Sequence, residues 1–95
     1  MTDTERTSEG RLLSDFEGRS ITLFPDRVEY TKKAFWSVQR GSIMLSRIIA
    51  VTVDYVDGFT KGKGYVSLET SDGKKHHLGL TTNAPEVHEA IYAAL

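Results

Sequence analysis

The sequence predicts a mainly β fold, a barrel or sandwich of about seven antiparallel strands followed by one C-terminal α-helix. Between residues 11 and 80, β-branched and aromatic residues alternate with polar ones in short runs, which is the period of strands. Turn-forming residues separate these runs, and after residue 81 the apolar spacing changes to that of a helix. Short strands in this number favour a barrel or sandwich, because both arrangements hide sheet edges.

The first three strands are predicted at residues 11–16, 21–23 and 27–31 from their alternation of apolar and polar residues. Glu17-Gly18 ends the first of them, since glycine interrupts regular structure. A tight turn joins the second and third strands at Pro25, because proline presets the backbone angle that the first central position of such a turn requires.

Two further elements follow from the apolar pattern of the middle of the chain. Residues 34–38 alternate in a way that predicts a fourth strand, and Trp36 is predicted to lie at the centre of the core. Residues 42–56 form the longest apolar stretch, and their phase changes near Ser46-Arg47, which predicts a short strand, a bend and a longer strand. The face of the longer strand that is expected to point inward carries Ile49, Val51, Val53 and Tyr55.

A glycine-rich loop at residues 57–64 is predicted to separate that strand from a final hairpin. The hairpin strands are predicted at residues 65–70 and 74–80. Asp72-Gly73 lies between them and accepts the positive backbone angles that such turns require.

The C-terminal helix is predicted from its start signals and its apolar stripe. Asn83 is expected to cap the first turn with its side chain, with Glu86 completing a capping box and Pro85 tolerated in the first turn. The stripe is expected to cover an open end or edge of the sheet and consists of Val87, Ala90, Ile91, Ala94 and Leu95.

Length and composition predict one domain at residues 11–95 and a disordered polar tail at residues 1–10. The tail lacks the basic start and apolar stretch of a signal peptide. The chain has no cysteine, which excludes disulfides and thiolate metal sites and predicts a cytoplasmic protein. The longest apolar run, residues 48–53, is far shorter than the roughly 20 residues that cross a bilayer.

Three segments resemble the small bacterial and archaeal pleckstrin-homology-like (PH-like) domains. They are GRSITLFPDRV at residues 18–28, IMLSRIIAV at residues 43–51 and GYVSLETSDG at residues 64–73. The first is similar to that family's strand, turn and strand, the second to its apolar ridge, and the third to its late hairpin before the terminal helix. The resemblance covers roughly residues 11–95 and implies a PH-like barrel of about seven antiparallel strands.

The same resemblance implies a non-catalytic module for protein interaction or self-assembly. Eukaryotic members that bind phosphoinositides have a basic loop between their first two strands. The matching turns here, Glu17-Gly18-Arg19 and Pro25-Asp26-Arg27, each place an acid beside one arginine. This departure argues against specific phosphoinositide binding.

A formal net charge of −1 argues against binding to nucleic acid, which normally needs a clearly basic domain. An anionic partner would have to meet a local patch instead. The candidate anion- or lipid-binding residues are Lys61, Lys63, Lys74 and Lys75. Lys32 and Lys33 would extend the patch if the strand ends meet, each lysine adding about 1 kcal/mol on an anionic membrane. The alternative is that these lysines only keep the loops soluble and protect edges.

Exposed apolar residues are the second class of candidate. Phe35, Tyr65, Ile48 and Val56 fall on faces opposite the presumed core, and Phe59 stands at the entrance of the glycine-rich loop. Phe35, Tyr65 and Phe59 are therefore candidate contacts for a protein partner or a second copy, especially near an unpaired sheet edge. The alternative is that a bend in the barrel buries them.

Metal binding and catalysis receive no support from the sequence. His76 and His77 are adjacent in a strand and point to opposite faces, so they do not share one ion, and His76 is expected to be half-buried and hydrogen-bonded. No nucleophile elbow, zinc-protease motif or dinucleotide-binding glycine pattern occurs, and neither an enzyme nor a cofactor is expected. The predicted function is protein–protein contact or self-assembly. The alternative is peripheral binding to anionic lipid, or to another phosphate-bearing ligand, through the lysine-rich loops.

Overall fold

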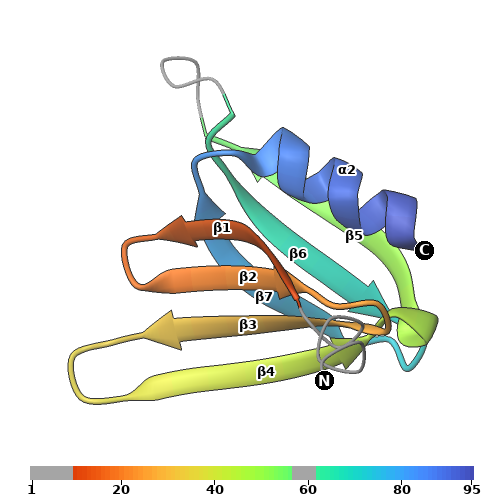
Figure 1. Ribbon diagram of the computed structural model, residues 1–95, viewed down its shortest axis with the longest axis horizontal. Coiled ribbons are helices and arrows are strands. Elements are labelled where there is room, and N and C mark those ends of the chain that lie inside the picture. The colour runs from red at the N-terminus through yellow and green to blue at the C-terminus, as the bar shows by residue number, and fades with distance from the viewer. Residues whose placement is uncertain (1–9, 57–61) are drawn as a thin grey trace, which may run out of the picture.

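The computed structural model describes residues 10–56 and 62–95 (Figure 1). The predicted tail apart from Gly10, and the candidates Phe59 and Lys61, lie outside the described residues. The strands are β1 (Arg11–Phe16), β2 (Arg19–Leu23), β3 (Arg27–Lys33), β4 (Val38–Met44), β5 (Ile48–Tyr55), β6 (Gly64–Thr70) and β7 (Lys75–Thr81). A short 3-10 helix, η1 (Leu45–Arg47), links β4 to β5, and the α-helix α2 (Ala84–Ala94) follows β7.

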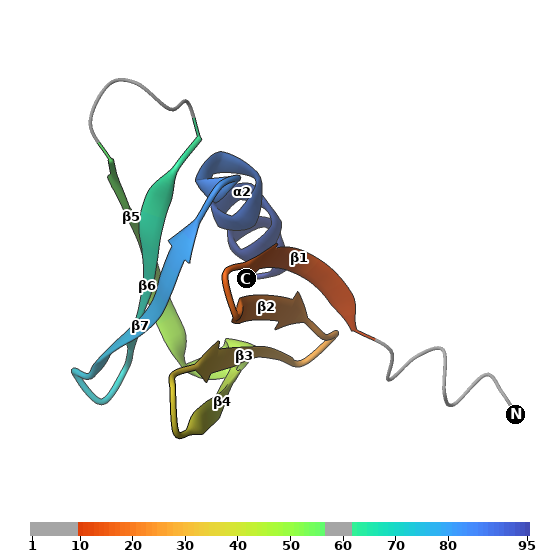
Figure 2. The same cartoon turned by 90° about the vertical axis from the view of Figure 1, so that its left-hand side faces the viewer.

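The strands form two antiparallel sheets, one of four strands in the order β1-β2-β3-β4 and one of three in the order β5-β6-β7. This confirms the prediction of a mainly β fold with one C-terminal helix. Among the described strands no pairing joins the two sheets into a closed barrel. Figure 2 shows the sheets facing each other across the core, with α2 running over their upper side.

The core fills the space between the two sheets and α2. β7 contacts the first three strands, and α2 lies against β5, β6 and β1. The largest fully buried side chains come from both sheets and the helix and include Ile21, Val28, Val66, Leu68, Leu78, Val87 and Ile91. Ala94 and Leu95 are exposed, so the predicted helical stripe is buried only in its first half.

Two predicted turns have the backbone that their residues favour. Glu17 and Gly18 both have positive φ, at 50° and 79°, between β1 and β2. Gly73 has a φ of 87° in the turn between β6 and β7, where the Thr70 amide donates to the Lys74 carbonyl at 2.9 Å. The sequence signals for these hairpins are therefore confirmed.

One predicted strand face is shifted by a bulge. Pairing of β5 with β6 is irregular between Ile48 and Ala50. Ile48 is therefore buried and Ile49 exposed, which is the reverse of the prediction for these two residues, because one extra residue moves a side chain to the other face. Val51 and Val53 pack against the core as predicted, whereas Tyr55 is exposed.

The predicted cap at the start of α2 is also different. Asn83 occupies the N-cap position, but its side chain makes no capping hydrogen bond and Glu86 completes no box. The Asn83 Nδ2 donates instead to the carbonyl of Leu13 in β1, at 2.8 Å. Asn83 supplies a partner to this partly buried strand carbonyl across 70 residues of chain, so a tertiary contact replaces the local cap.

Candidate functional site

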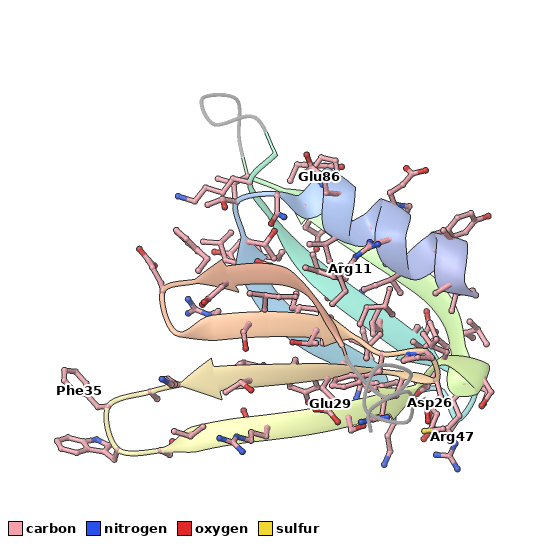
Figure 3. All side chains as sticks on the ribbon, viewed as in Figure 1. Arg11, Asp26, Glu29, Phe35, Arg47 and Glu86 are labelled. Atoms are coloured by element: carbon pink, nitrogen blue, oxygen red, sulfur yellow. The ribbon has the colours of Figure 1, made fainter. Side chains whose placement is uncertain are left out.

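The β3–β4 hairpin ends in two adjacent aromatic residues that make almost no contact with the rest of the protein. The Ala34 amide donates to the Ser37 carbonyl at 2.8 Å, which leaves Phe35 and Trp36 at the centre of the turn. Each side chain is 93% exposed, and their ring centroids are 5.4 Å apart. Figure 3 shows Phe35 at the far end of the hairpin, directed away from both sheets. The tip therefore presents an aromatic pair to the surroundings.

This position of Trp36 contradicts its prediction as the centre of the core. The alternation of residues 34–38 resembles a strand, but the chain reverses there and the strands end at Lys33 and resume at Val38. The centre of a tight turn is normally occupied by glycine, proline, asparagine, aspartate or serine, so the pattern did not identify this turn. Two aromatic residues at such a position lose the burial that would stabilise the fold.

The stem of the hairpin carries the tip beyond the core. Val28 of β3 and its partner Ile43 of β4 are buried, whereas Lys33 and its partner Val38 at the other end are exposed. The turn lies at one end of the longest axis of the molecule, which extends 45 Å (Figure 1). The hairpin therefore projects past the second sheet.

A tyrosine holds the middle of the stem together. A Cβ added at Gly41 of β4 would lie 2.3 Å from the ring Cζ of Tyr30, its cross-strand partner. The ring therefore occupies the space that a side chain at residue 41 would need. The Lys32 Nζ lies 5.7 Å from the centroid of the same ring, a cation–π distance. The middle of the stem is thus well packed, and Tyr30 also contacts the core.

The hairpin is basic, and among the described residues Lys32, Lys33 and Arg40 form no ion pair within 4 Å. Residues 30–53 contain Lys32, Lys33, Arg40 and Arg47 and no acidic residue. In the described parts of the chain, the ion pairs connect Arg27 with Asp26 and Glu29, both at 2.8 Å. Lys33 pairs in register with Val38, Lys32 with Gln39 and Thr31 with Arg40, so three bases lie within roughly 10 Å of the turn. A collar of positive charge therefore surrounds the aromatic tip.

The predicted lysine patch is divided between two ends of one strand. Lys63 precedes β6, where its Nζ lies 5.5 Å from the centroid of the Phe16 ring. Lys74 and Lys75 follow β6, at the other end of its seven residues, which is about 20 Å away. The described lysines of this set therefore form no single surface, and Lys32 and Lys33 belong to the β3–β4 hairpin.

The candidate interaction residues Phe35 and Tyr65 are exposed, which is one of the two alternatives that the sequence left open, but they lie on different sheets. Phe35 is in the β3–β4 turn, whereas Tyr65 is on β6, opposite Asp54, with 52% of its surface exposed. Val56 is exposed as well, and Ile48 is buried. These residues do not combine into one apolar surface.

The histidines have structural partners. His76 is half-buried and its Nε2 lies 3.2 Å from Thr70 Oγ1, as the sequence predicts. The His77 Nδ1 lies 3.1 Å from Ser67 Oγ on the adjacent strand. The described residues contain no cluster of three His, Cys, Asp or Glu side chains suited to a metal ion. None of the described helices is long and apolar enough to cross a membrane.

Comparison with known proteins gives no further information about this site. No family model, curated protein or solved structure matches the chain. The resemblance to PH-like domains therefore stays a prediction. Sequence reasoning named Phe35, Lys32 and Lys33 separately but missed that a turn brings them together with exposed Trp36 and Arg40. The signal was present as an aromatic pair inside an acid-free basic segment.

Proposed function

We propose that this protein is a non-catalytic module that binds anionic membranes peripherally through its β3–β4 hairpin. The observation that carries the proposal is the pair of 93% exposed rings, Phe35 and Trp36, at a tip surrounded by Lys32, Lys33 and Arg40. Tryptophan is enriched at the level of lipid headgroups, where an amphipathic ring is partly buried. Lysine and arginine beside it attract the negative surface of the cytoplasmic leaflet.

The expected strength is that of reversible binding. Burial of each aromatic side chain contributes about 1.5–3 kcal/mol, and three bases contribute about 1 kcal/mol each near an anionic surface. The costs of association and ordering reduce this sum, so affinities in the micromolar to millimolar range are expected. Such a module would come on and off a membrane as the lipid charge or the ionic strength changes.

We further propose that the two sheets and the C-terminal helix form a PH-like fold. Four strands, three strands and a C-terminal helix in that order support it. The membrane-binding element then differs from the basic first loop of phosphoinositide-binding members, since here it lies between β3 and β4. The proposed location is the cytoplasm, with peripheral attachment to the membrane.

A single tryptophan makes the proposal directly measurable. Trp36 is the only tryptophan of the chain, so its fluorescence reports on the hairpin tip alone. Mixing the protein with phosphatidylserine-containing vesicles at low salt is expected to shift Trp36 emission to shorter wavelength, and raising the salt should reverse the shift. An emission spectrum that vesicles leave unchanged would refute membrane insertion of the tip.

Variants separate the apolar and charged contributions. Phe35→Ser is expected to weaken vesicle binding about tenfold or more, because it removes one buried ring. Lys33→Gln should weaken it about fivefold, from the loss of one surface charge. Lys75→Gln is the matched control, since it removes the same charge from β7 of the other sheet and should leave binding nearly unchanged. Equal effects of Lys33→Gln and Lys75→Gln would contradict a localised site.

Self-association through β4 is the second candidate. β4 pairs only with β3 in the described sheet, and five of its seven residues are exposed, so its outer edge is suited to extending the sheet with another copy. However, two copies would bring identical acid-free basic segments together. Light scattering over a range of concentrations tests this candidate, and a constant monomer mass would remove it.

A further inference from the structure

A polar pocket lies at the end of β4 opposite the aromatic tip. Its volume is about 210 Å³, enough for on the order of seven water molecules. The walls come from both sheets and η1 and consist of Ser42, Ile43, Met44, Arg47, Thr70, Asp72, Lys74 and His76. Figure 3 shows Arg47 at this end of the molecule, far from Phe35. The pocket is therefore separate from the hairpin tip.

The charged groups of the pocket favour an anion. Arg47 and Lys74 contribute two positive charges, and the hydroxyl of Ser42 adds a hydrogen-bond donor. Arginine and lysine together provide the donors that phosphate oxygens accept most readily. Among the described residues Asp72 is the single carboxylate in the wall, and one carboxylate does not make a cation site.

The carboxylate of Asp72 is already engaged by its own turn. The Thr70 hydroxyl donates to Asp72 Oδ1 at 2.5 Å, and the Lys74 amide donates to the same oxygen at 3.2 Å. These two hydrogen bonds lower the pKa of Asp72. Asp72 forms no ion pair with Arg47 or Lys74 within 4 Å in the described structure, although the positive charge of Lys74 also helps to lower its pKa.

The wall of the pocket is held in place by hydrogen bonds. The Thr70 hydroxyl, which donates to Asp72, also lies 3.2 Å from His76 Nε2, and this hydrogen bond orients the imidazole. The Ser71 amide donates to the Arg47 carbonyl at 2.9 Å and ties η1 to the β6–β7 turn. A site on such a preformed backbone loses little freedom when a ligand binds.

We propose that this pocket binds a phosphate-bearing anion through Arg47 and Lys74. The inference goes beyond membrane binding by the tip, because it involves other residues at the other end of β4. The chemistry is shared by a soluble phosphate compound and by a lipid phosphomonoester headgroup. Both present terminal phosphate oxygens to the same two bases.

The first test uses inorganic phosphate in solution and nuclear magnetic resonance of backbone amides. Saturable shifts are expected at residues 71–74 and at Arg47. Arg47→Gln should weaken phosphate binding about tenfold or more, since it removes a charged donor. Arg19→Gln removes the same charge from β2, outside the pocket, and should leave the affinity nearly unchanged.

A third variant examines the charge inside the pocket. Asp72→Asn retains an acceptor oxygen for Thr70 and Lys74 but removes the negative charge, so phosphate should bind more tightly. Absence of saturable shifts in the wild type, or equal weakening by Arg47→Gln and Arg19→Gln, would overturn the proposal. These results do not depend on membrane binding, because no lipid is present.

Vesicles then distinguish the two sources of phosphate. Phosphatidic acid and phosphatidylserine vesicles of equal anionic content are compared for the wild type and Arg47→Gln. A preference for phosphatidic acid that Arg47→Gln abolishes assigns the pocket to a lipid headgroup. Equal binding to both vesicles, together with saturable binding of inorganic phosphate, assigns it to a soluble ligand.

Discussion

Two hairpin turns of this protein differ in what their residues do. The turn between β6 and β7 uses Asp72-Gly73, and its side chains and amides bind one another. The turn between β3 and β4 places Phe35 and Trp36 at its centre, where each is 93% exposed. Both turns join strands of seven residues. The first turn stabilises its own backbone, whereas the second exposes two aromatic side chains, which we propose contact a membrane.

This difference separates turn residues that make contacts inside the protein from turn residues that make few. Residues of the β6–β7 turn have partners inside the protein, so replacing them should destabilise the fold. Residues of the β3–β4 tip have few such partners, so replacing them should change binding and leave the fold intact. Turn residues that destabilise the fold and make no compensating contacts within the protein are expected at a functional site.

The largest expected effect is on the buried hydroxyl of the stable turn. Thr70→Val removes the group that serves both Asp72 and His76 and should lower the free energy of unfolding by about 1–3 kcal/mol. The double variant Phe35→Ser and Trp36→Ser should change it by less than about 0.5 kcal/mol. Urea unfolding followed by circular dichroism measures both. A tip variant as unstable as Thr70→Val would break the comparison.

A smaller effect is expected from the backbone of the same turn. Gly73 has a φ of 87°, and an added Cβ there would meet nothing within 4 Å. Gly73→Ala should therefore cost about 1 kcal/mol through backbone strain alone. Gly73→Asn is the matched control and should cost less, because asparagine tolerates this conformation better. Equal losses for the two variants, measured by urea unfolding, would mean that backbone conformation is not the cause.

The fold was predictable where local chemistry and tertiary structure agree. Asp72-Gly73 and Glu17-Gly18 form the predicted turns, because their backbone angles follow from the residues themselves. The predicted burial of Ile48 and Ile49 was reversed, because the bulge in β5 depends on pairing with β6 and is not visible in the local sequence. Asn83 was misread for a similar reason, since its partner, Leu13, is 70 residues away.

The aromatic tip and the polar pocket were less predictable, because each depends on how the chain folds in space. An apolar pair such as Phe35 and Trp36 fits a buried strand as well as an exposed turn until the reversal of the chain is known. The pocket required β4, η1 and the β6–β7 turn to meet, and only Lys74 was identified in advance. The absence of acidic residues between residues 30 and 53 is visible in the sequence, and it is the pattern that indicates a basic surface.

The smallest expected effect concerns the acid dependence of stability. Hydrogen bonds from the Thr70 hydroxyl and the Lys74 amide lower the pKa of Asp72 from its ordinary 3.8. A carboxyl whose pKa is lower in the folded state stabilises that state fully above its unfolded pKa, and this contribution is lost as the pH falls through the folded value. The urea midpoint of the wild type should therefore fall more between pH 6 and pH 3 than that of Asp72→Asn, which does not titrate. The Phe35→Ser variant should follow the wild type, since the tip contains no acid. Parallel losses in the wild type and Asp72→Asn would show that Asp72 contributes no acid dependence, and the contrast between the two turns would then depend on Thr70 and Gly73 alone.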